Sequence, residues 1–267
     1  MLLFPNAKIN IGLNIVRKRP DGYHDISTVM YPIPLKDELE ISKSEKLSFS
    51  IDGIPLADDG KENLVLRAWR LVDHEYNIGN VNMRLRKNIP SGAGLGGGSA
   101  DAAFTIRGLN DLFGIGMSAN EMERMASTLG ADCPFFIKNT PAVCQGIGDI
   151  MTPVDLSLKG MLLVLIKPDI FVPTPEAYRN CSPKPWDTPL LKTLELPVTY
   201  WKNDVKNDFE THIFSKHPLL KTLKDDFYAD GAFYSAMSGS GSAIFGIYNN
   251  NQKINILSKY NGYLLTL

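Results

Sequence analysis

The residues of this chain best suited to chemistry form a glycine cluster, in which five of the seven residues from Gly92 to Gly98 are glycine. Glycines allow the backbone to approach an anion closely, and the free N–H groups and dipole of a helix start favour negative charge there. The pattern therefore predicts a phosphate-binding loop between a strand and a helix. A tight turn is the weaker alternative, because so many glycines destabilise a chain that does not require them. The loop comprises Pro90, Ser91, Gly92, Ala93, Gly94, Leu95, Gly96, Gly97, Gly98, Ser99 and Ala100.

The common phosphate loops do not describe this cluster. The Walker pattern fails because Gly97 is followed by Gly98 and not by lysine. The spacing does match the dinucleotide fingerprint, but the strand before such a loop is normally apolar on both faces, whereas residues 81–87 alternate apolar with polar. The H-R-D and D-F-G motifs of protein kinases are absent from the sequence. A further type of phosphate loop is indicated.

The elements that must hold this loop begin with a period-two strand over residues 7–15. We expect one apolar, packed face and one free face, the latter carrying Lys8, Asn10, Gly12 and Asn14. Further strands are predicted over residues 37–42, 46–51 and 81–87. The loop thus follows a half-buried strand.

Three helices are predicted in the first half of the chain. Asn63 has the residue type of an N-cap for the first, and the second follows the glycine cluster and ends at Gly114. Ser118 and Glu121 form a capping box for the third. The second half is predicted to contain a buried strand over 161–166, irregular structure or short helical turns over 169–197, a helix around 219–227, two strands flanking 238–242, a short helix near 254–259 and a strand over 263–267. This mixture indicates an α+β protein.

The composition excludes several classes of function. With 28 Lys+Arg against 29 Asp+Glu the net charge is −1, so no nucleic-acid or membrane partner is expected and any bound anion must be held by local geometry. The 3 cysteines show no C-x-x-C spacing and the 4 histidines no H-E-x-x-H, which argues against a disulfide framework or a built-in metal site. No signal-peptide core is expected at the N-terminus, so we predict a cytoplasmic protein, as a monomer or a homodimer.

Beyond the loop, seven short segments together resemble the GHMP small-molecule kinases in order and spacing. The resemblance covers nearly the whole chain, so it is far more specific than the glycine loop alone. These segments are Ala7-Lys8-Ile9-Asn10, Arg19-Pro20-Asp21-Gly22-Tyr23-His24, Glu62-Asn63-Leu64, Gly130-Ala131-Asp132-Cys133-Pro134-Phe135, Pro173-Thr174-Pro175, Asn207-Asp208-Phe209-Glu210 and Ser238-Gly239-Ser240-Gly241.

The resemblance implies a two-domain fold with the active site in the cleft between the domains. A mixed-sheet, ATP-binding N-terminal domain would span residues 1–155, and a smaller C-terminal α/β sandwich domain residues 156–267. It also implies a phosphotransferase with ATP as donor. The triple glycine and the Asp21–His24 segment point to the branch that phosphorylates the 2-hydroxyl of a cytidine-diphosphate-linked methylerythritol in non-mevalonate isoprenoid (terpenoid) biosynthesis.

The resemblance also assigns the catalytic pair. The residue matching Asp132 is the base in related kinases, and a carboxylate can both accept the proton of a hydroxyl and hold it in line. Lys8 would be its partner, keeping the carboxylate ionised and steadying the charge of the transferred phosphoryl group. Taken without the resemblance, Asp132 reads equally well as a helix cap and Lys8 as an exposed lysine.

The remaining roles follow the same match. Asn10 and Asp132 are expected to contact the acceptor, and Tyr23 and His24 to hold the cytosine ring. Thr174 is also expected to bind the substrate, and Tyr178 is a candidate for the opposite face of that ring or a packing residue. Asn63 and Leu64 are expected near the adenine, although a simple N-cap also explains Asn63. The loop over 238–242 would either donate to phosphate or close a hairpin.

One departure concerns the metal. Many members of the family carry two serines where this chain has Gly97 and Gly98, and the second serine holds Mg²⁺. We therefore expect no protein metal ligand, and Mg²⁺ carried by the nucleotide, with Ser99 as an optional contact. The alternatives left open are another GHMP kinase, of homoserine or mevalonate type, and a non-catalytic nucleotide-binding module.

Overall fold

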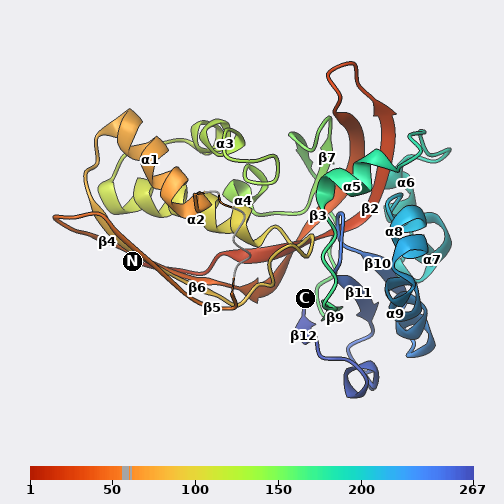
Figure 1. Ribbon diagram of the computed structural model, residues 1–267. Helices are drawn as coiled ribbons and strands as arrows, with labels where there is room; N and C mark the ends of the chain where they lie inside the picture. The colour runs from red at the N-terminus through yellow and green to blue at the C-terminus, as the bar shows by residue number, and fades with distance from the viewer. Residues whose placement is uncertain (56–59, 61) are drawn as a thin grey trace. The chain divides into compact units, whose positions relative to one another are not determined.

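Two units, each discontinuous in sequence, make up the protein in a computed structural model that describes residues 1–55, 60 and 62–267 (Figure 1). The first unit comprises Met1–Lys8, Leu35–Ser91 and Gly96–Thr140; the second comprises Ile9–Pro34, Gly92–Leu95 and Pro141–Leu267. The second unit contains more residues than the first, and it includes residues 9–34 from the N-terminal part of the chain. A domain boundary after residue 155 stays a prediction.

The first unit is built on a four-stranded sheet with the order β1-β4-β6-β5. β4 pairs antiparallel with β1 and β6, and β5 pairs parallel with β6. Alternate residues of β6 are buried and exposed, as predicted, and the buried set ends in Lys87. The strands are β1 (Leu2–Leu3), β4 (Glu38–Lys43), β5 (Ser48–Gly53) and β6 (Val81–Lys87).

Three helices of the first unit begin where the sequence predicts, whereas a fourth, short helix was not predicted. The Asn63 side chain accepts the Val65 N–H at the start of α1, Gly114 ends α2 in the left-handed conformation, and Ser118 and Glu121 form the capping box of α3. α1 packs against α2. The helices are α1 (Leu64–Tyr76), α2 (Gly97–Phe113), α3 (Ala119–Ser127) and α4 (Phe135–Lys138).

A second sheet has the order β2-β3-β7-β8 and corrects two expectations. The predicted strand over 7–15 lies within β2, but both of its faces are buried there: Lys8, Asn10 and Asn14 are 3–4% exposed, so the expected free face is wrong. The other three strands were not predicted, since two prolines and irregular alternation obscure β3, and β7 and β8 are very short. The strands are β2 (Asn6–Lys18), β3 (His24–Lys36), β7 (Ala142–Gln145) and β8 (Ile150–Pro153).

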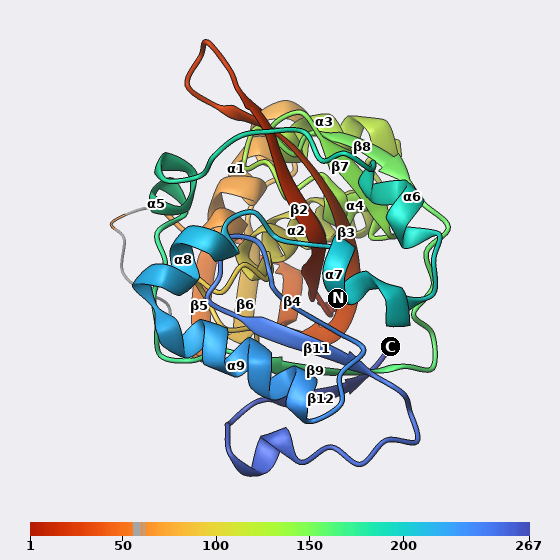
Figure 2. The same ribbon diagram turned by 90° about the vertical axis from the view of Figure 1, so that its right-hand side faces the viewer.

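The second unit also contains an antiparallel sheet of order β10-β11-β9-β12, against which α9 packs (Figure 2). The strands expected on either side of residues 238–242 are β10 and β11. The region 169–197 holds two short helices within irregular chain, as predicted. The elements are β9 (Leu162–Ile166), α5 (Thr174–Arg179), α6 (Leu190–Leu194), η1 (Val198–Tyr200), α7 (Trp201–Asp204), α8 (Glu210–Lys216), α9 (Pro218–Ala229), β10 (Tyr234–Met237), β11 (Ile244–Tyr248), η2 (Ile256–Ser258) and β12 (Tyr263–Thr266).

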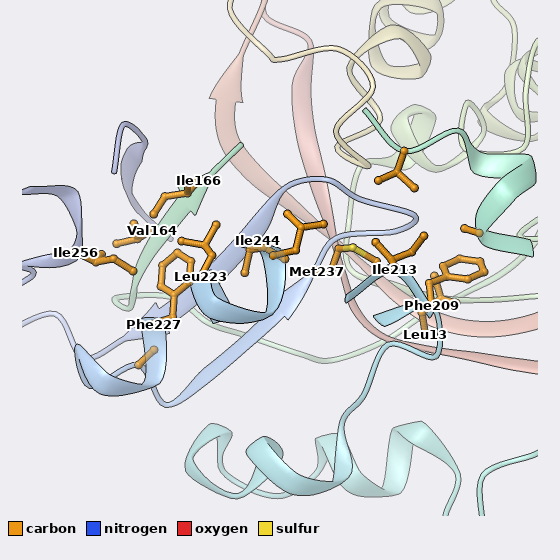
Figure 3. Packing of buried hydrophobic residues seen from close by; sticks show 14 of the residues in the cluster. Leu13, Val164, Ile166, Phe209, Ile213, Leu223, Phe227, Met237, Ile244 and Ile256 are labelled. Atoms are coloured by element: carbon orange, nitrogen blue, oxygen red, sulfur yellow. The ribbon is translucent and has the colours of Figure 1, made fainter. Parts of the chain in front are cut away.

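Apolar side chains from β9, β11, α8 and α9 form the core of this unit (Figure 3). Phe227 of α9 and Ile244 of β11 are fully buried in it. β2 contributes Leu13 and Ile15 to the same cluster, which explains why residues 9–34 belong to this unit. Within the described part of the chain, no helix has the length and apolar character needed to cross a membrane.

Candidate active site

Lys8 and Asp132 form an ion pair in the first unit, with Lys8 Nζ 3.2 Å from Asp132 Oδ2. The lysine side chain is 4% exposed and the carboxylate 31% exposed. Lys8 is therefore a buried cation with its charge directed at a partly solvated acid, and not the exposed lysine that one reading of the sequence allowed. The predicted partners are brought together.

Two further contacts position this pair. Asp132 lies in the turn before α4, where the Cys133 N–H donates to Gly130 O at 3.1 Å. Asn6 at the start of β2 and Asn139 at the end of α4 exchange side-chain hydrogen bonds of 3.2 and 2.6 Å. The amide pair thus links the strand that carries Lys8 to the helix that follows Asp132. No motif or periodicity in the sequence signals this amide pair.

The glycine loop is divided between the two units. Residues 92–95 belong to the second unit, while the part from Gly96 onward belongs to the first, and α2 already begins at Gly97. Gly96 is the left-handed N-cap of α2, and the first turn of the helix contains no acidic residue. A Cβ at Gly96 would lie 3.1 Å from Lys8 Cε. The helix start is therefore a suitable cradle for phosphate beside the Lys8–Asp132 pair.

The first half of the loop contacts the turn between β10 and β11. Ser238 Oγ donates to Gly94 O at 2.9 Å and accepts the Asn10 N–H at 3.2 Å. A Cβ at Gly94, whose φ is +76°, would lie 1.9 Å from Ser238 O. Residues 238–242 close a hairpin, and their observed contacts support the glycine loop.

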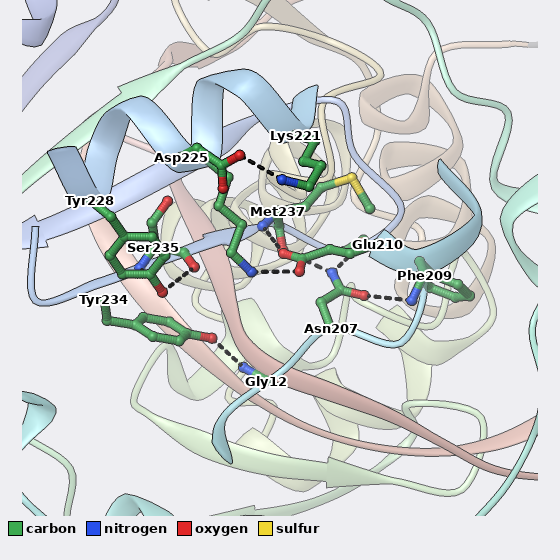
Figure 4. Close-up of polar contacts among 12 residues, drawn as sticks. Gly12, Asn207, Phe209, Glu210, Lys221, Asp225, Tyr228, Tyr234, Ser235 and Met237 are labelled. Carbon is green, nitrogen blue, oxygen red and sulfur yellow. Dashed lines mark hydrogen bonds and ion pairs between the residues drawn. The ribbon is translucent and has the colours of Figure 1, made fainter. Parts of the chain in front are cut away.

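This hairpin turn is itself held by the Asn207–Glu210 segment. Asn207 Nδ2 donates to Met237 O and Gly239 O, both at 2.8 Å, and Glu210 Oε1 accepts the Met237 N–H at 2.8 Å (Figure 4). Burial raises the pKa of Glu210, opposed by Lys224, whose Nζ lies 2.6 Å from Glu210 Oε2. The Asn207–Glu210 segment therefore holds the backbone of the hairpin turn by hydrogen bonds.

Asn10 is buried in the second unit and hydrogen bonded within it. Its Nδ2 donates to Thr28 Oγ1 at 3.1 Å, and Thr28 Oγ1 donates to Gly12 O at 2.5 Å. A Cβ at Gly239 would lie 3.2 Å from Asn10 Oδ1. A role of Asn10 in acceptor binding stays a prediction.

Asn63 and Leu64 lie at the start of α1 in the first unit. The Asn63 side chain accepts the Val65 N–H at 2.9 Å, as an N-cap does. A Cβ at Gly98 would lie 3.7 Å from Leu64 Cδ1, so this leucine is next to the first turn of α2. That position is compatible with the expected place beside the nucleotide.

The predicted cytosine-binding residues belong to the second unit. The rings of His24 and Tyr178 are stacked with their centroids 5.2 Å apart, and Tyr23 is 62% exposed. Stacked bases are separated by about 3.4 Å, so a base held between the two rings would require about 7 Å between them. The observed distance of 5.2 Å is too short for this, so the two rings stack on each other. Burial, and to a smaller extent the charge of Lys18, lower the pKa of His24, which favours a neutral imidazole. Thr174, at the start of α5, hydrogen bonds Ser240 Oγ at 3.0 Å.

A buried cluster of three charged residues connects the two ends of the loop, and the sequence did not lead us to predict it. Lys87 Nζ lies 2.6 Å from Asp101 Oδ2 and also contacts Asp37 Oδ2. Burial raises the pKa of Asp101 to about 7; the charge of Lys87 acts against the shift and that of Asp37 adds to it. The signal was present in the sequence, because Lys87 shares the parity of the buried residues of its strand. Lys87 is thus a second buried lysine near the loop, in addition to Lys8.

Cys133 and Ser99 interact beside the start of α2. The Ser99 hydroxyl hydrogen bonds with the Cys133 thiol, whose pKa burial raises to about 11. The thiol stays protonated near neutral pH and is a poor nucleophile. Ser99 thus has a structural partner in this arrangement.

Comparison with known proteins shows similarity over nearly the whole chain. The sequence matches the family descriptions "GHMP kinases N terminal domain" over residues 63–140 and "GHMP kinases C terminal" over residues 199–264. A Parabacteroides distasonis protein named 4-diphosphocytidyl-2-C-methyl-D-erythritol kinase is 51% identical over 93% of this chain and 92% of its own length. A Bacteroides fragilis protein of the same name is 48% identical over 95% of this chain and 94% of its own length. A crystal structure described as 4-(cytidine 5'-diphospho)-2C-methyl-D-erythritol kinase matches with a TM-score of 0.80 and 34% identity, covering 92% of this chain and 90% of that one.

Proposed function

The chain belongs to the GHMP kinase family, and on that premise we propose that it transfers the γ-phosphoryl group of ATP to the 2-hydroxyl of 4-(cytidine 5'-diphospho)-2-C-methyl-D-erythritol. The products are the 2-phosphate and ADP, in the non-mevalonate route of isoprenoid biosynthesis. Relatives at 51% and 48% identity carry the name of this activity, which favours it over the homoserine and mevalonate kinase alternatives. The observation that carries a catalytic role is the buried Lys8 ammonium 3.2 Å from Asp132.

In this proposal Asp132 is the general base. Its carboxylate is the partly exposed member of the pair, so it can accept the proton of the acceptor hydroxyl as the bond from that oxygen to the γ-phosphorus forms. Lys8 is fixed in place by burial, and its positive charge compensates the negative charge of the base and of the phosphoryl group during transfer. The bond between the γ-phosphorus and the bridging oxygen breaks, and ADP leaves.

The glycine loop is the proposed ATP site. Backbone N–H groups at the start of α2 and in residues 91–96 would bind the phosphates, with Leu64 next to Gly98 on the nucleotide side. Mg²⁺ enters with ATP as part of this substrate. Asn10, Tyr23, His24, Thr174 and Tyr178 are the proposed acceptor-binding residues. A cytoplasmic location is likewise proposed.

The base assignment is tested by Asp132→Asn, which keeps the shape of the side chain and removes its ability to accept a proton. ADP release, measured by a coupled assay with the diphosphocytidyl acceptor, is expected to fall about 10²- to 10⁴-fold in kcat. ATP binding, measured by calorimetry, should remain. Asp111→Asn, at an exposed position on α2, is the matched control and should keep wild-type turnover.

Two results would contradict the proposal at different levels. Unchanged turnover in Asp132→Asn would exclude this residue as the base. Activity with homoserine or mevalonate, and none with the diphosphocytidyl acceptor, would show that the substrate is wrong while the kinase assignment holds.

A further inference from the structure

Three buried charged residues of the first unit have no part in the chemistry proposed above. Asp37, Lys87 and Asp101 are 0%, 2% and 3% exposed, respectively. Lys87 Nζ lies 2.6 Å from Asp101 Oδ2 and also donates to Asp37 Oδ2. Buried ions of this kind are costly unless paired, and one lysine here faces two carboxylates. The cluster therefore requires an explanation beyond stability.

The cluster is connected to both ends of the glycine loop. Asp37 Oδ1 accepts the N–H groups of Asn88 at 2.6 Å and Ile89 at 2.9 Å, the two residues that precede Pro90. At the other end, Asp101 is the fifth residue of α2, whose start forms the end of the loop. Lys87 Nζ joins the two carboxylates and lies 3.4 Å from the position that a Cβ at Gly97 would occupy. The three residues thus fix the entry and the exit of the loop.

We propose that Asp37, Lys87 and Asp101 are positioning residues of the phosphate loop, and that a proton taken up by Asp101 adjusts the affinity of this loop for ATP. With all three ionised the cluster carries a net charge of −1, and with Asp101 protonated it is neutral. A negative charge buried beside the start of α2 opposes the binding of a polyanion, so the protonated cluster binds ATP more tightly. The proposal rests on the proposed function to the extent that the loop binds ATP.

The surroundings of Asp101 support such a proton. Asp101 Oδ1 is buried without a hydrogen-bond partner among residues 1–55, 60 and 62–267. The charged groups that act on Asp101 are Lys87 from β6 and Asp37 from the end of β3, and burial raises its pKa most strongly. Other charged groups also lie near the start of α2. Lys8, paired with Asp132, lies next to Gly96, and the charge of Arg67 on α1 lowers the pKa of Cys133. A proton on Asp101 removes the repulsion between the two carboxylates.

The test is the dissociation constant of MgATP, measured by calorimetry from pH 6 to pH 8.5 without the acceptor. In the wild type, binding is expected to weaken on the order of 3- to 10-fold as pH rises, beyond any change that ATP itself causes. Asp101→Asn keeps the side-chain shape with a fixed neutral charge, so this additional pH dependence should disappear and binding at pH 8.5 should be tighter than in the wild type. Asp111→Asn, on the exposed side of the same helix, should retain the wild-type profile.

Asp37→Asn provides an independent variant, because an amide oxygen can still accept the Asn88 and Ile89 N–H groups. Removing this negative charge should move the midpoint of the wild-type profile to lower pH, which a merely structural role would not do. Identical pH profiles in the wild type and Asp101→Asn, or an unmoved midpoint in Asp37→Asn, would overturn the proposal. Absence of ATP binding to the wild type would instead contradict the proposed function.

Discussion

The two halves of the glycine loop are supported by different chemistry. Residues 92–95, in the second unit, are held by neutral hydrogen bonds and close packing from the hairpin turn, with Ser238 Oγ between Gly94 O and the Asn10 N–H. The part in the first unit ends in α2, which a buried lysine and two buried carboxylates connect to the strand before the loop. The contacts that reach the first half directly are neutral, although Glu210 holds the hairpin turn that makes them, whereas the second half is supported by ionic contacts.

In the function proposed above, this difference would allow a nearly neutral protein both to fix and to adjust a site for a highly charged ligand. Neutral hydrogen bonds define the path of the backbone at any pH at which the protein is folded, and they add no charge to repel phosphate. Buried ions define the path only when they are balanced, so their contribution depends on protonation. Breaking the neutral support should therefore change stability at every pH, and changing the charged one should alter the pH dependence.

The largest effect is expected from Gly94→Ala, which breaks the neutral support by steric overlap. The added Cβ would lie 1.9 Å from Ser238 O, at a φ of +76° that disfavours alanine. We expect a loss of about 3 to 5 kcal/mol in the free energy of unfolding, measured by urea denaturation. Gly98→Ala is the matched control, since its nearest contact would be 3.7 Å away within a helix. A change of at most about 1 kcal/mol, towards greater stability, is expected there; equal losses in both variants would contradict the packing argument.

The sequence was sufficient for most elements, since these depend on local patterns, and the family resemblance brought Lys8 and Asp132 together as an expected pair. Alternation predicted β6, caps predicted the starts of α1 and α3, and the motif match placed Lys8 with Asp132. What it did not provide were relations between distant segments, such as the Asn6–Asn139 amide pair and the contact of Ser238 with Gly94. Each joins residues 133 or 144 positions apart, for which no periodicity gives a signal.

The burial of β2 illustrates the same limit. Alternation correctly predicted a strand, but it could not show that its polar residues would be covered as well. Lys8 and Asn10 are buried by neighbours that are distant in sequence, and the unpredicted β3 pairs with the same strand. Lys87 is the opposite case. It is two residues after the buried Leu85 on β6, so the alternation of the strand already placed it on the buried face.

A smaller effect is expected in the pH dependence of stability, which probes the charged support. Because the pKa of Asp101 is raised in the folded state, this carboxyl group keeps its proton in the folded protein but not in the unfolded chain between about pH 4 and the folded pKa of about 7. The contribution of Asp101 to stability therefore falls as pH rises through that window. In Asp101→Asn this fall should be reduced by about 2 to 3 kcal/mol between pH 5 and pH 8, as measured by urea unfolding at each pH.

The comparison of wild type and Asp101→Asn isolates this one group. The pKa of Glu210 is also raised, so its contribution to stability also falls as pH rises, but this fall is the same in both proteins. Parallel stability curves for the two proteins from pH 5 to pH 8 would show that Asp101 does not change its protonation on unfolding in this range.

The smallest effect is expected from Ser238→Ala, which weakens the neutral support without steric overlap. The substitution removes the hydroxyl that donates to Gly94 O at 2.9 Å and accepts the Asn10 N–H at 3.2 Å. A loss of about 1 kcal/mol is expected, because each remaining group is left with one partner fewer. The loss should be the same at pH 5 and pH 8, because neither hydrogen bond involves a titrating group. Ser240→Ala, which removes only an exposed contact with Thr174, should change stability by less than about 0.5 kcal/mol. A loss in Ser238→Ala that grows with pH would mean that the two supports are coupled through the loop, and the separation between them argued above would then fail.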